Sequence, residues 1–345
     1  MSAVWYTRCP LPTASGVAIS GGFLDAAFAG EGIAVRSLRD AEQDVREQHF
    51  DHAHPALFRQ GGNIPPIWAR SRGAGTRLIG LSWPQTFQAV ISLPDRGLRS
   101  AADLRAARIA LPRHVHGQID FWRAMVLRGT VSAAQSAGLA ADELRFVDVD
   151  VQEGFLTEEH AVDGGSLFTA RESARLWSSE ALALVRGEVD AIYVYGPVGL
   201  QTVAFLDAVV VTDIGSLDRR LQINGTTPTA LTVSADLLEE RPQDVERYVA
   251  TLLRAADHAG EHPDDAFRVF AAEAGAGEEW ARIAHPPELP NQLRPSLDPE
   301  LVRALEDQID FLLHHGFIDR GIDLDAWIDA RPLTAATRLA DAVAL

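Results

Sequence analysis

The chain of 345 residues contains no lysine and a single cysteine, Cys9. Without a lysine amine the protein cannot form a Schiff base or attach pyridoxal phosphate covalently. A Walker A phosphate loop also requires a lysine, so this class of nucleotide-binding protein is excluded. One cysteine cannot form an intramolecular disulfide, which is typical of proteins in a reducing compartment. We therefore expect a cytoplasmic protein with a free thiol.

Positive charge and long hydrophobic runs are also scarce. The formal net charge is −17, which argues against nucleic acid or an anionic membrane as a partner, because both require a basic surface. No apolar run approaches the roughly 20 residues of a membrane helix. The opening MSAVWYTRCPLP lacks the basic start and apolar core of a signal peptide. This charge does not exclude a small anion as a ligand, provided that individual arginines bind it.

The pattern along the chain is an alternation of strand-like and helix-like segments, which predicts an α/β fold. Residues 4–12 indicate a first strand that ends in a loop, and residues 15–32 a helix that ends at Gly30 and Gly32. Further apolar runs predict the strands 33–40, 76–83, 87–95, 108–111, 143–151 and 189–197. Amphipathic segments predict helices within residues 116–129, 173–187 and 298–316. Residues 230–263 predict a strand followed by a long helix.

Two segments suggest how these elements are arranged. SAADLRAARIALPR (100–113) and ALALVRGEVDAIYVYGP (181–197) resemble segments of the type II periplasmic-binding-protein fold. That resemblance implies two α/β lobes with a ligand cleft between them. We expect the first lobe to comprise residues 1–108 and 228–345, and the second lobe residues 109–227.

Cys9 lies in YTRCPLP, just beyond the first predicted strand. A lone cysteine is often only a small buried hydrophobic residue. In open α/β sheets, however, ligands bind outside the carboxyl ends of the strands, which is where this cysteine lies. Cations or a helix N-terminus nearby would make its thiolate reactive.

The most unusual segment is HFDHAHPALFRQGGNIPP, residues 49–66. The spacing of His49, His52 and His54 is not that of a structural zinc site, and no second cysteine is available, so we expect no metal. We interpret His52 and His54 as residues of a surface loop. Arg59 is different, because the adjacent Gly61-Gly62 pair lets backbone N–H groups approach an anion that the guanidinium also binds.

This segment resembles the active-site segment of the 2′-hydroxybiphenyl-2-sulfinate desulfinase family. GAGTRLIGL (73–81) resembles its continuation, and Y-x-x-C-P-x-P (6–12) and G-F-L-D-A-A (22–27) resemble the family's nucleophile region. The similarity is close over roughly the first 110 residues and looser beyond. The matching positions in residues 49–66 are His49, Phe50, Pro55, Ala56, Arg59, Gly61, Gly62, Ile64, Pro65 and Pro66.

The resemblance implies roles for individual residues. Cys9 and His49 correspond to the catalytic cysteine and histidine, and Arg59 to the arginine that binds the sulfinate. Gly62 corresponds to a backbone N–H donor. Further residues are expected to bind substrate, the aromatic ones as pocket walls; they are Gly61, Phe50, Trp122 and Trp327.

The implied reaction is hydrolysis of the carbon–sulfur bond of a small aromatic sulfinate, with no metal or organic cofactor, by a monomer. Cys9 is either the nucleophile that attacks sulfur or the general acid that protonates the ring carbon. The competing interpretation is a protein that only binds a small anion, and the missing secretion signal argues against it. A pyrimidine-precursor synthase on the same fold is disfavoured because those enzymes use a lysine-bound cofactor.

Overall fold

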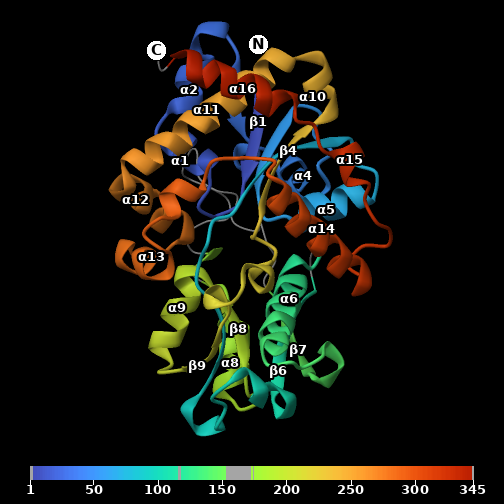
Figure 1. The fold of residues 1–345 in the computed structure, drawn as a ribbon, viewed down its shortest axis with the longest axis vertical. Helices are drawn as coiled ribbons and strands as arrows, with labels where there is room; N and C mark the ends of the chain where they lie inside the picture. Colours follow the sequence, from blue (N-terminus) through green and yellow to red (C-terminus); the bar gives the residue numbers. More distant parts are fainter. Residues whose placement is uncertain (1–2, 116–117, 153–171, 174, 344–345) are drawn as a thin grey trace.

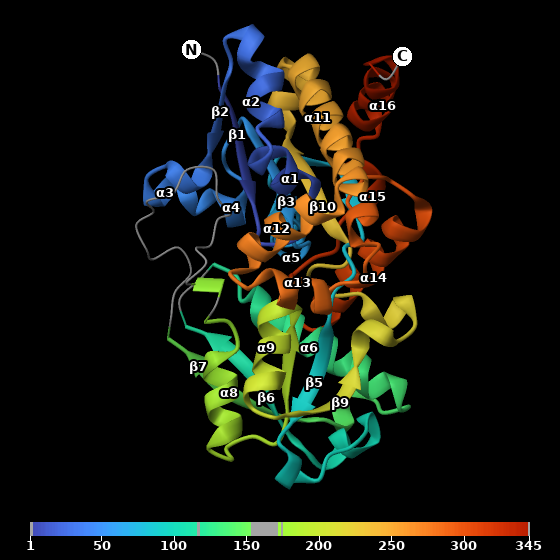
Figure 2. The same ribbon diagram turned by 90° about the vertical axis from the view of Figure 1, so that its left-hand side faces the viewer.

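The computed structural model describes residues 3–115, 118–152, 172–173 and 175–343. Figures 1 and 2 show two lobes, one above the other, with both chain ends in the upper one. The upper, first lobe combines the beginning and the end of the chain, in blue, orange and red, and the lower, second lobe is built from the middle, mainly in green and yellow (Figure 1). Both lobes mix helices and strands, as the alternating sequence pattern predicted.

A five-stranded sheet forms the centre of the first lobe, in the order β2-β1-β3-β10-β4. β1 runs parallel to β2 and to β3, whereas β10 is antiparallel to β3 and to β4. β1 and β3 therefore end at the same edge of the sheet. The strands are β1 (Ala3–Arg8), β2 (Ala34–Ser37), β3 (Leu57–Gly61), β4 (Thr76–Ser82) and β10 (Thr229–Ser234).

Helices cover both faces of this sheet. On one face, α11 (Pro242–Glu261) presents the buried Val245, Val249, Leu252 and Ala256, whose spacing places them on one helical side. The other face is covered by helices that include α14, whose buried Leu301, Leu305, Ile309 and Leu312 repeat in the same way. The helices of this lobe are α1 (Ala14–Ser20), α2 (Phe23–Phe28), α3 (Gln43–Arg46), α4 (Gln48–Asp51), α5 (Ile64–Ser71), α10 (Ala235–Glu240), α11, α12 (Pro263–Ala274), α13 (Glu278–Ala284), α14 (Pro299–His314), α15 (Leu324–Trp327) and α16 (Arg331–Val343).

The single helix predicted over residues 15–32 is in fact two. α1 begins at a cap where the Thr13 side chain accepts from Gly16 N, and it ends at Gly21. Gly22 has a φ of 68°, in the left-handed region that glycine adopts readily, and it redirects the chain into α2. The glycine pair therefore ends the helix earlier than Gly30 and Gly32 would.

The second lobe contains two small sheets. β5 (Gln88–Ser92) pairs antiparallel with β8 (Ile192–Tyr195) and with β9 (Val209–Asp213). β6 (Arg108–His114) pairs parallel with β7 (Arg145–Val151). The lobe's helices are α6 (Phe121–Ser136), α8 (Ser178–Val185) and α9 (Gly196–Phe205).

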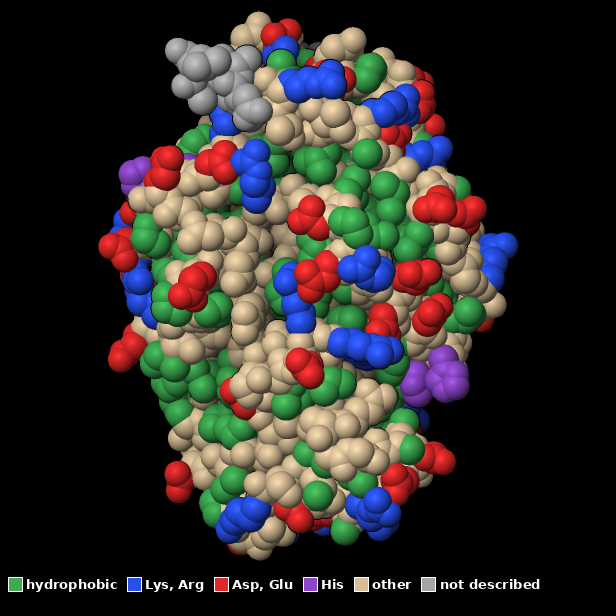
Figure 3. Space-filling view, in the orientation of Figure 1, with side chains coloured by type: hydrophobic (Ala, Val, Ile, Leu, Met, Phe, Trp, Pro, Cys, Tyr) green, Lys and Arg blue, Asp and Glu red, His purple; other side chains and the backbone are tan. Residues whose placement is uncertain are grey.

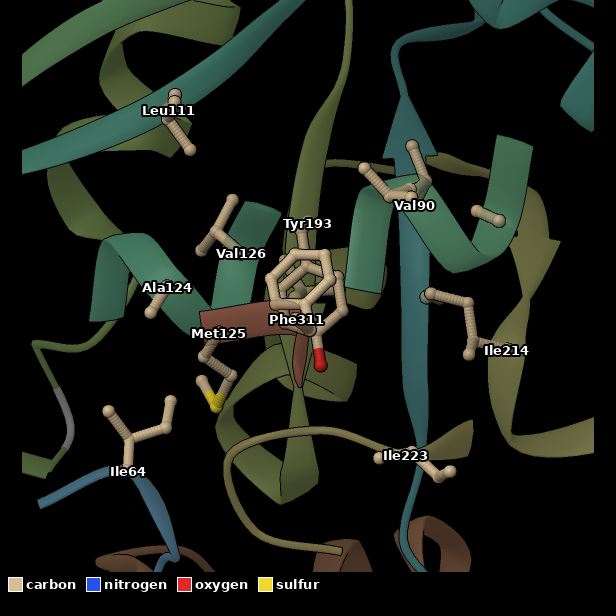
Figure 4. Close-up of a cluster of buried hydrophobic side chains, with 14 of the residues drawn as sticks. Ile64, Val90, Leu111, Ala124, Met125, Val126, Tyr193, Ile214, Ile223 and Phe311 are labelled. Carbon is tan, nitrogen blue, oxygen red and sulfur yellow. The ribbon is translucent and has the colours of Figure 1, made fainter. Parts of the chain in front are cut away.

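The core of the second lobe forms between α6 and these strands. Met125 and Val126 of α6 lie near Tyr193 of β8, and Ile64 of the first lobe approaches the same cluster (Figure 4). Gly129 allows the close contact, because a Cβ at this position would overlap the Tyr193 ring.

The sheets divide the chain before residue 108, where we predict the lobe boundary. β5 belongs to the sheet of the second lobe, so the change occurs between Ser82 and Gln88. The apolar run 87–95 indicates a buried strand but carries no signal of which sheet it joins. The chain returns to the first sheet with β10, next to residue 228.

Short 3₁₀ helices connect several elements. No helix among the described ranges is both long and apolar enough to cross a membrane. Acidic and arginine side chains are interspersed over the face shown in Figure 3. The 3₁₀ helices are η1 (Ala29–Glu31), η2 (Leu38–Asp40), η3 (Pro94–Arg96), η4 (Ala101–Ala106), η5 (Ala141–Glu143), η6 (Ile214–Ser216), η7 (Arg219–Gln222) and η8 (Leu289–Gln292).

Candidate active site

Cys9 is the first residue after β1, at the edge where β1 and β3 end together. Its backbone N–H donates to Gln60 O at 3.2 Å, and its carbonyl accepts from Leu11 N at 2.8 Å. These bonds hold the turn that carries the thiol against the end of β3. The side chain is partly exposed toward a pocket between the lobes.

Arg59 lies in β3 and is fully buried. Its Nη1 donates to the Gly62 carbonyl at 2.8 Å. Its Nη2 is 3.5 Å from Cys9 Sγ and 3.5 Å from His49 Nε2. The guanidinium is therefore held at one end and faces the thiol and the imidazole at the other. Its burial lowers the pKa of Arg59, and the charge of Cys9 opposes that effect.

His49 lies in α4 and is also buried. Its Nε2 is 3.8 Å from Cys9 Sγ, and its Nδ1 is 2.8 Å from Thr7 Oγ1. Burial, followed by the charges of Arg59 and His52, lowers the pKa of His49 well below its usual value, so the ring is neutral near pH 7. Because a guanidinium only donates, we assign Nε2 as the unprotonated nitrogen, with Nδ1–H donating to Thr7.

Other parts of the chain lie so close to residues 61 and 62 that neither position has room for a side chain. A Cβ at Gly61 would overlap the Cys9 side chain. A Cβ at Gly62 would lie 2.7 Å from the Gly225 carbonyl, which accepts from Asn63 N. Gly61 therefore allows the thiol to lie against β3, and Gly62 allows the segment before β10 to lie against the same edge.

The pocket beside these residues is largely apolar and has a volume of about 90 Å³. Cys9, His49, Arg59 and Gly62 form its polar end, and Phe50 and Trp122, both predicted as pocket residues, line it as well. The rings of Phe50 and Phe121 stack with centroids 6.0 Å apart across the two lobes. The remaining described lining residues are Pro10, Leu11, Ile64, Pro65, Met125, Ser173, Leu176, Tyr195, Gly196, Pro197, Val198, Gly225, Thr226 and Ala274.

Trp327, predicted as a pocket residue, lies elsewhere. Its ring is fully buried, and Nε1 donates to Thr76 Oγ1 at 3.1 Å, which fixes α15 to the start of β4. It does not line the pocket. The GIDLDAW segment thus supplies a packing residue of the first lobe, because α15 contacts β4 rather than the cleft.

Of the two histidines predicted to lie in a surface loop, His52 differs from that prediction and His54 does not. His52 is buried with a φ of 58°, and its Nδ1 is 3.1 Å from Phe50 O. His54 is partly exposed, and its Nδ1 accepts from Ala56 N at 3.1 Å. The described ranges contain no group of three or more His, Cys, Asp or Glu side chains suited to a metal ion.

The sequence motifs do not point to several of the residues that form the site. Thr7, two residues before Cys9 in β1, orients His49 only because β1 and α4 come together in the fold. Phe121 precedes the predicted Trp122 on the same helix and lines the same pocket. Tyr195 could have been proposed, because it ends a predicted strand at the cleft, whereas Thr226 lies in a segment without regular structure.

Comparison with known proteins agrees with this arrangement. The chain is 30% identical over 346 aligned residues to the 2′-hydroxybiphenyl-2-sulfinate desulfinase of Rhodococcus erythropolis, with 93% of this chain and 90% of that protein covered. The protein of the same description from Rhodococcus qingshengii matches to the same extent. No family model matches the chain.

Solved structures give the same result for the fold. The desulfurization enzyme DszB superimposes with a TM-score of 0.78 at 26% identity, with 98% of this chain and 99% of that chain covered. A cysteine-to-serine variant of DszB in complex with biphenyl-2-sulfinic acid gives 0.79. The periplasmic aliphatic sulphonate-binding protein SsuA of Escherichia coli, at 13% identity and a TM-score of 0.66, shares the fold.

The predicted two-lobed type II periplasmic-binding-protein fold is therefore confirmed. The identity to the curated desulfinases extends over nearly the whole length of both chains, well beyond the motif around Arg59. This chain belongs to the 2′-hydroxybiphenyl-2-sulfinate desulfinase family.

Proposed function

We propose that the protein is a desulfinase that hydrolyses an aryl sulfinate of the 2-hydroxybiphenyl type. The observation that carries this proposal is the position of the Cys9 thiol, within 4 Å of both Arg59 and His49 at the polar end of an apolar pocket. The relatives named for this sulfinate, and the DszB variant with biphenyl-2-sulfinic acid, support it. The proposed reaction takes an aryl sulfinate and water to the arene and hydrogen sulfite.

Arg59 is proposed to bind the sulfinate group. Its guanidinium is already oriented by the Gly62 carbonyl, so little freedom is lost when an anion arrives. The Gly62 N–H is the proposed second donor, and Gly61 allows the thiol to approach the same point. Phe50 and Trp122 would contact the aromatic rings. Donors fixed in this way stabilise negative charge where it develops in the reaction.

His49 is proposed to handle the proton of Cys9. Its neutral ring directs Nε2 toward the thiol at 3.8 Å, so a small movement suffices for it to accept the proton. The resulting thiolate would lie beside Arg59. Two routes stay open: attack of Cys9 on sulfur, or transfer of the Cys9 proton to the ring carbon as the carbon–sulfur bond breaks. Neither route uses a metal or an organic cofactor, and we propose a monomeric enzyme of the cytoplasm.

Sulfite release from a panel of aryl sulfinates tests the proposed function. We expect turnover of biphenyl-type sulfinates and none of the corresponding sulfonates, and we expect Cys9→Ser to reduce the rate at least about a hundredfold while still binding substrate. Binding without any sulfite release by the unmodified protein would instead identify a protein that only captures the anion. A serine variant that keeps more than about a tenth of the rate would exclude Cys9 as the reacting group.

A further inference from the structure

The peptide group between Gly62 and Asn63 is held on both of its sides. Its carbonyl, on Gly62, accepts from Arg59 Nη1 at 2.8 Å. Its N–H, on Asn63, donates to Gly225 O at 2.7 Å. Glycine restricts the backbone less than any other residue, so these two bonds decide which way the Gly62 carbonyl points. The orientation of the Arg59 guanidinium therefore depends on residue 225 as well as on residue 62.

The Asn63 side chain binds the loop that contains Gly225, residues 224–228. This side chain is fully buried and does not line the pocket. Its Nδ2 donates to Asn224 O and to Pro228 O, each at 2.8 Å. Because both partners are carbonyl oxygens, only the amide nitrogen can face them. One carboxamide group thus connects the two ends of the loop, and it fixes the carbonyl to which its own backbone N–H donates.

The loop is also anchored to the second lobe. Asn224 Nδ2 donates to the Tyr193 hydroxyl of β8 at 2.8 Å and to Gln88 Oε1 of β5 at 3.2 Å. Asn224 Oδ1 accepts from Gly225 N at 2.7 Å. These side chains are buried. Because the loop has these anchors of its own, loss of the Asn63 side-chain bonds would release the Gly62 peptide rather than the loop.

We propose that Asn63 is a positioning residue of the anion-binding end, which acts through the Gly62 carbonyl on the orientation of the Arg59 guanidinium. The inference rests on the proposed function, in which Arg59 binds the sulfinate group. Since Asn63 does not line the pocket, its effect on the anion must pass through the residues that do. The aromatic part of a ligand, which contacts other walls of the pocket, should not be affected.

A double-mutant cycle tests this coupling, with equilibrium binding of biphenyl-2-sulfinate and of uncharged biphenyl measured in the Cys9→Ser background. Asn63→Leu removes both side-chain donors and nearly keeps the volume of the side chain. Arg59→Lys removes the planar group through which the effect would act. Thr76→Val is the control, because it also removes a buried hydrogen bond, the one from Trp327, at a position outside the pocket lining.

We expect Asn63→Leu to weaken sulfinate binding about tenfold and to leave biphenyl binding unchanged. In the Arg59→Lys background the same change should have little further effect, because the contributions of residues that act through one another are not additive. Thr76→Val should leave both affinities unchanged in either background.

An unchanged sulfinate affinity in Asn63→Leu would overturn the inference, and so would a parallel loss for biphenyl. A full tenfold loss in addition to that of Arg59→Lys would also overturn it, because Asn63 would then not act through Arg59. If Asn63→Leu does not fold, Asn63→Ser, whose hydroxyl can make only one of the two bonds, takes its place in the cycle with the same criteria. Failure of the proposed function is distinct, since the protein with Cys9 intact would then release no sulfite, whatever the affinities.

Discussion

At the scale of single residues, the site depends on one guanidinium that contacts a carbonyl, a thiol and an imidazole at once. Arg59 reaches all three because it lies in β3, between β1 and β10. A lysine ammonium at this position could reach one of them but could not hold the others in the same plane.

Arg59→Lys should therefore reduce kcat/KM for sulfinate turnover at least about thirtyfold. A charge-assisted pair in a closed site is worth roughly 2–5 kcal/mol, and each 1.4 kcal/mol corresponds to about a factor of ten. Steady-state sulfite release measures the effect. Arg72→Lys is the control, because Arg72 is exposed and lies over the Trp68 ring, away from the pocket. Equal losses of kcat/KM in both variants would indicate a general effect of positive charge and exclude specific binding of the sulfinate by Arg59.

At the scale of elements, the end of β3 and the turn after β1 fit together only because residue 61 has no side chain. We predict that Gly61→Ala displaces the Cys9 thiol and lowers kcat at least about tenfold, since shifts of about 1 Å in a reacting group can cost a hundredfold. Gly75→Ala is the matched control, because a Cβ there meets no atom within 4 Å. Full activity of the Gly61 variant, with the control also active, would show that the thiol position is not critical.

The connection from α4 to β3 also contains a buried imidazole that should make stability depend on pH. Burial, followed by the charge of Arg59, lowers the pKa of His52 to about 3. The unfolded chain therefore binds a proton near pH 6.5 that the folded protein does not, and stability falls as the pH decreases from 6.5 toward 3. At about 1.4 kcal/mol per pH unit, this amounts to about 2 kcal/mol between pH 6.5 and pH 5.

His52→Asn should flatten this dependence, because asparagine does not titrate and tolerates the positive φ of this position. Urea unfolding at pH 5 and pH 7.5 measures the change. The flattening should be partial, since His49 and His285 also have pKa values lowered by burial. An identical pH response of the His52 variant and the unmodified protein would contradict the prediction.

Local sequence patterns predicted the individual helices and strands better than they predicted which sheet each strand joins. The apolar repeats of α11 and α14 are visible in the sequence because burial selects one side of a helix. Cys9 and Arg59 could be proposed because the motifs surround them. The sheet to which β5 belongs, the contact of Thr7 with His49 and the packing role of Trp327 all depend on tertiary contacts between distant segments. Such contacts leave no periodic signal.

At the scale of the whole molecule, the pocket takes its polar end from the first lobe and much of its aromatic wall from α6 of the second. None of this requires an ion between the lobes. We expect exhaustive chelator treatment to leave sulfite release unchanged, because His49, His52 and His54 each direct Nδ1 to a separate partner. Stoichiometric zinc in the purified protein, lost together with activity and restored with it, would contradict this expectation.

The solitary thiol of the chain has a practical consequence, because it lines the pocket and is partly exposed. A thiol-directed titrant can modify the protein at one position only, so one equivalent of reagent counts competent sites in a preparation. Protection of that position by an added compound reports occupancy directly. Candidate ligands can then be ranked by how much they slow the labelling, even when they are not turned over.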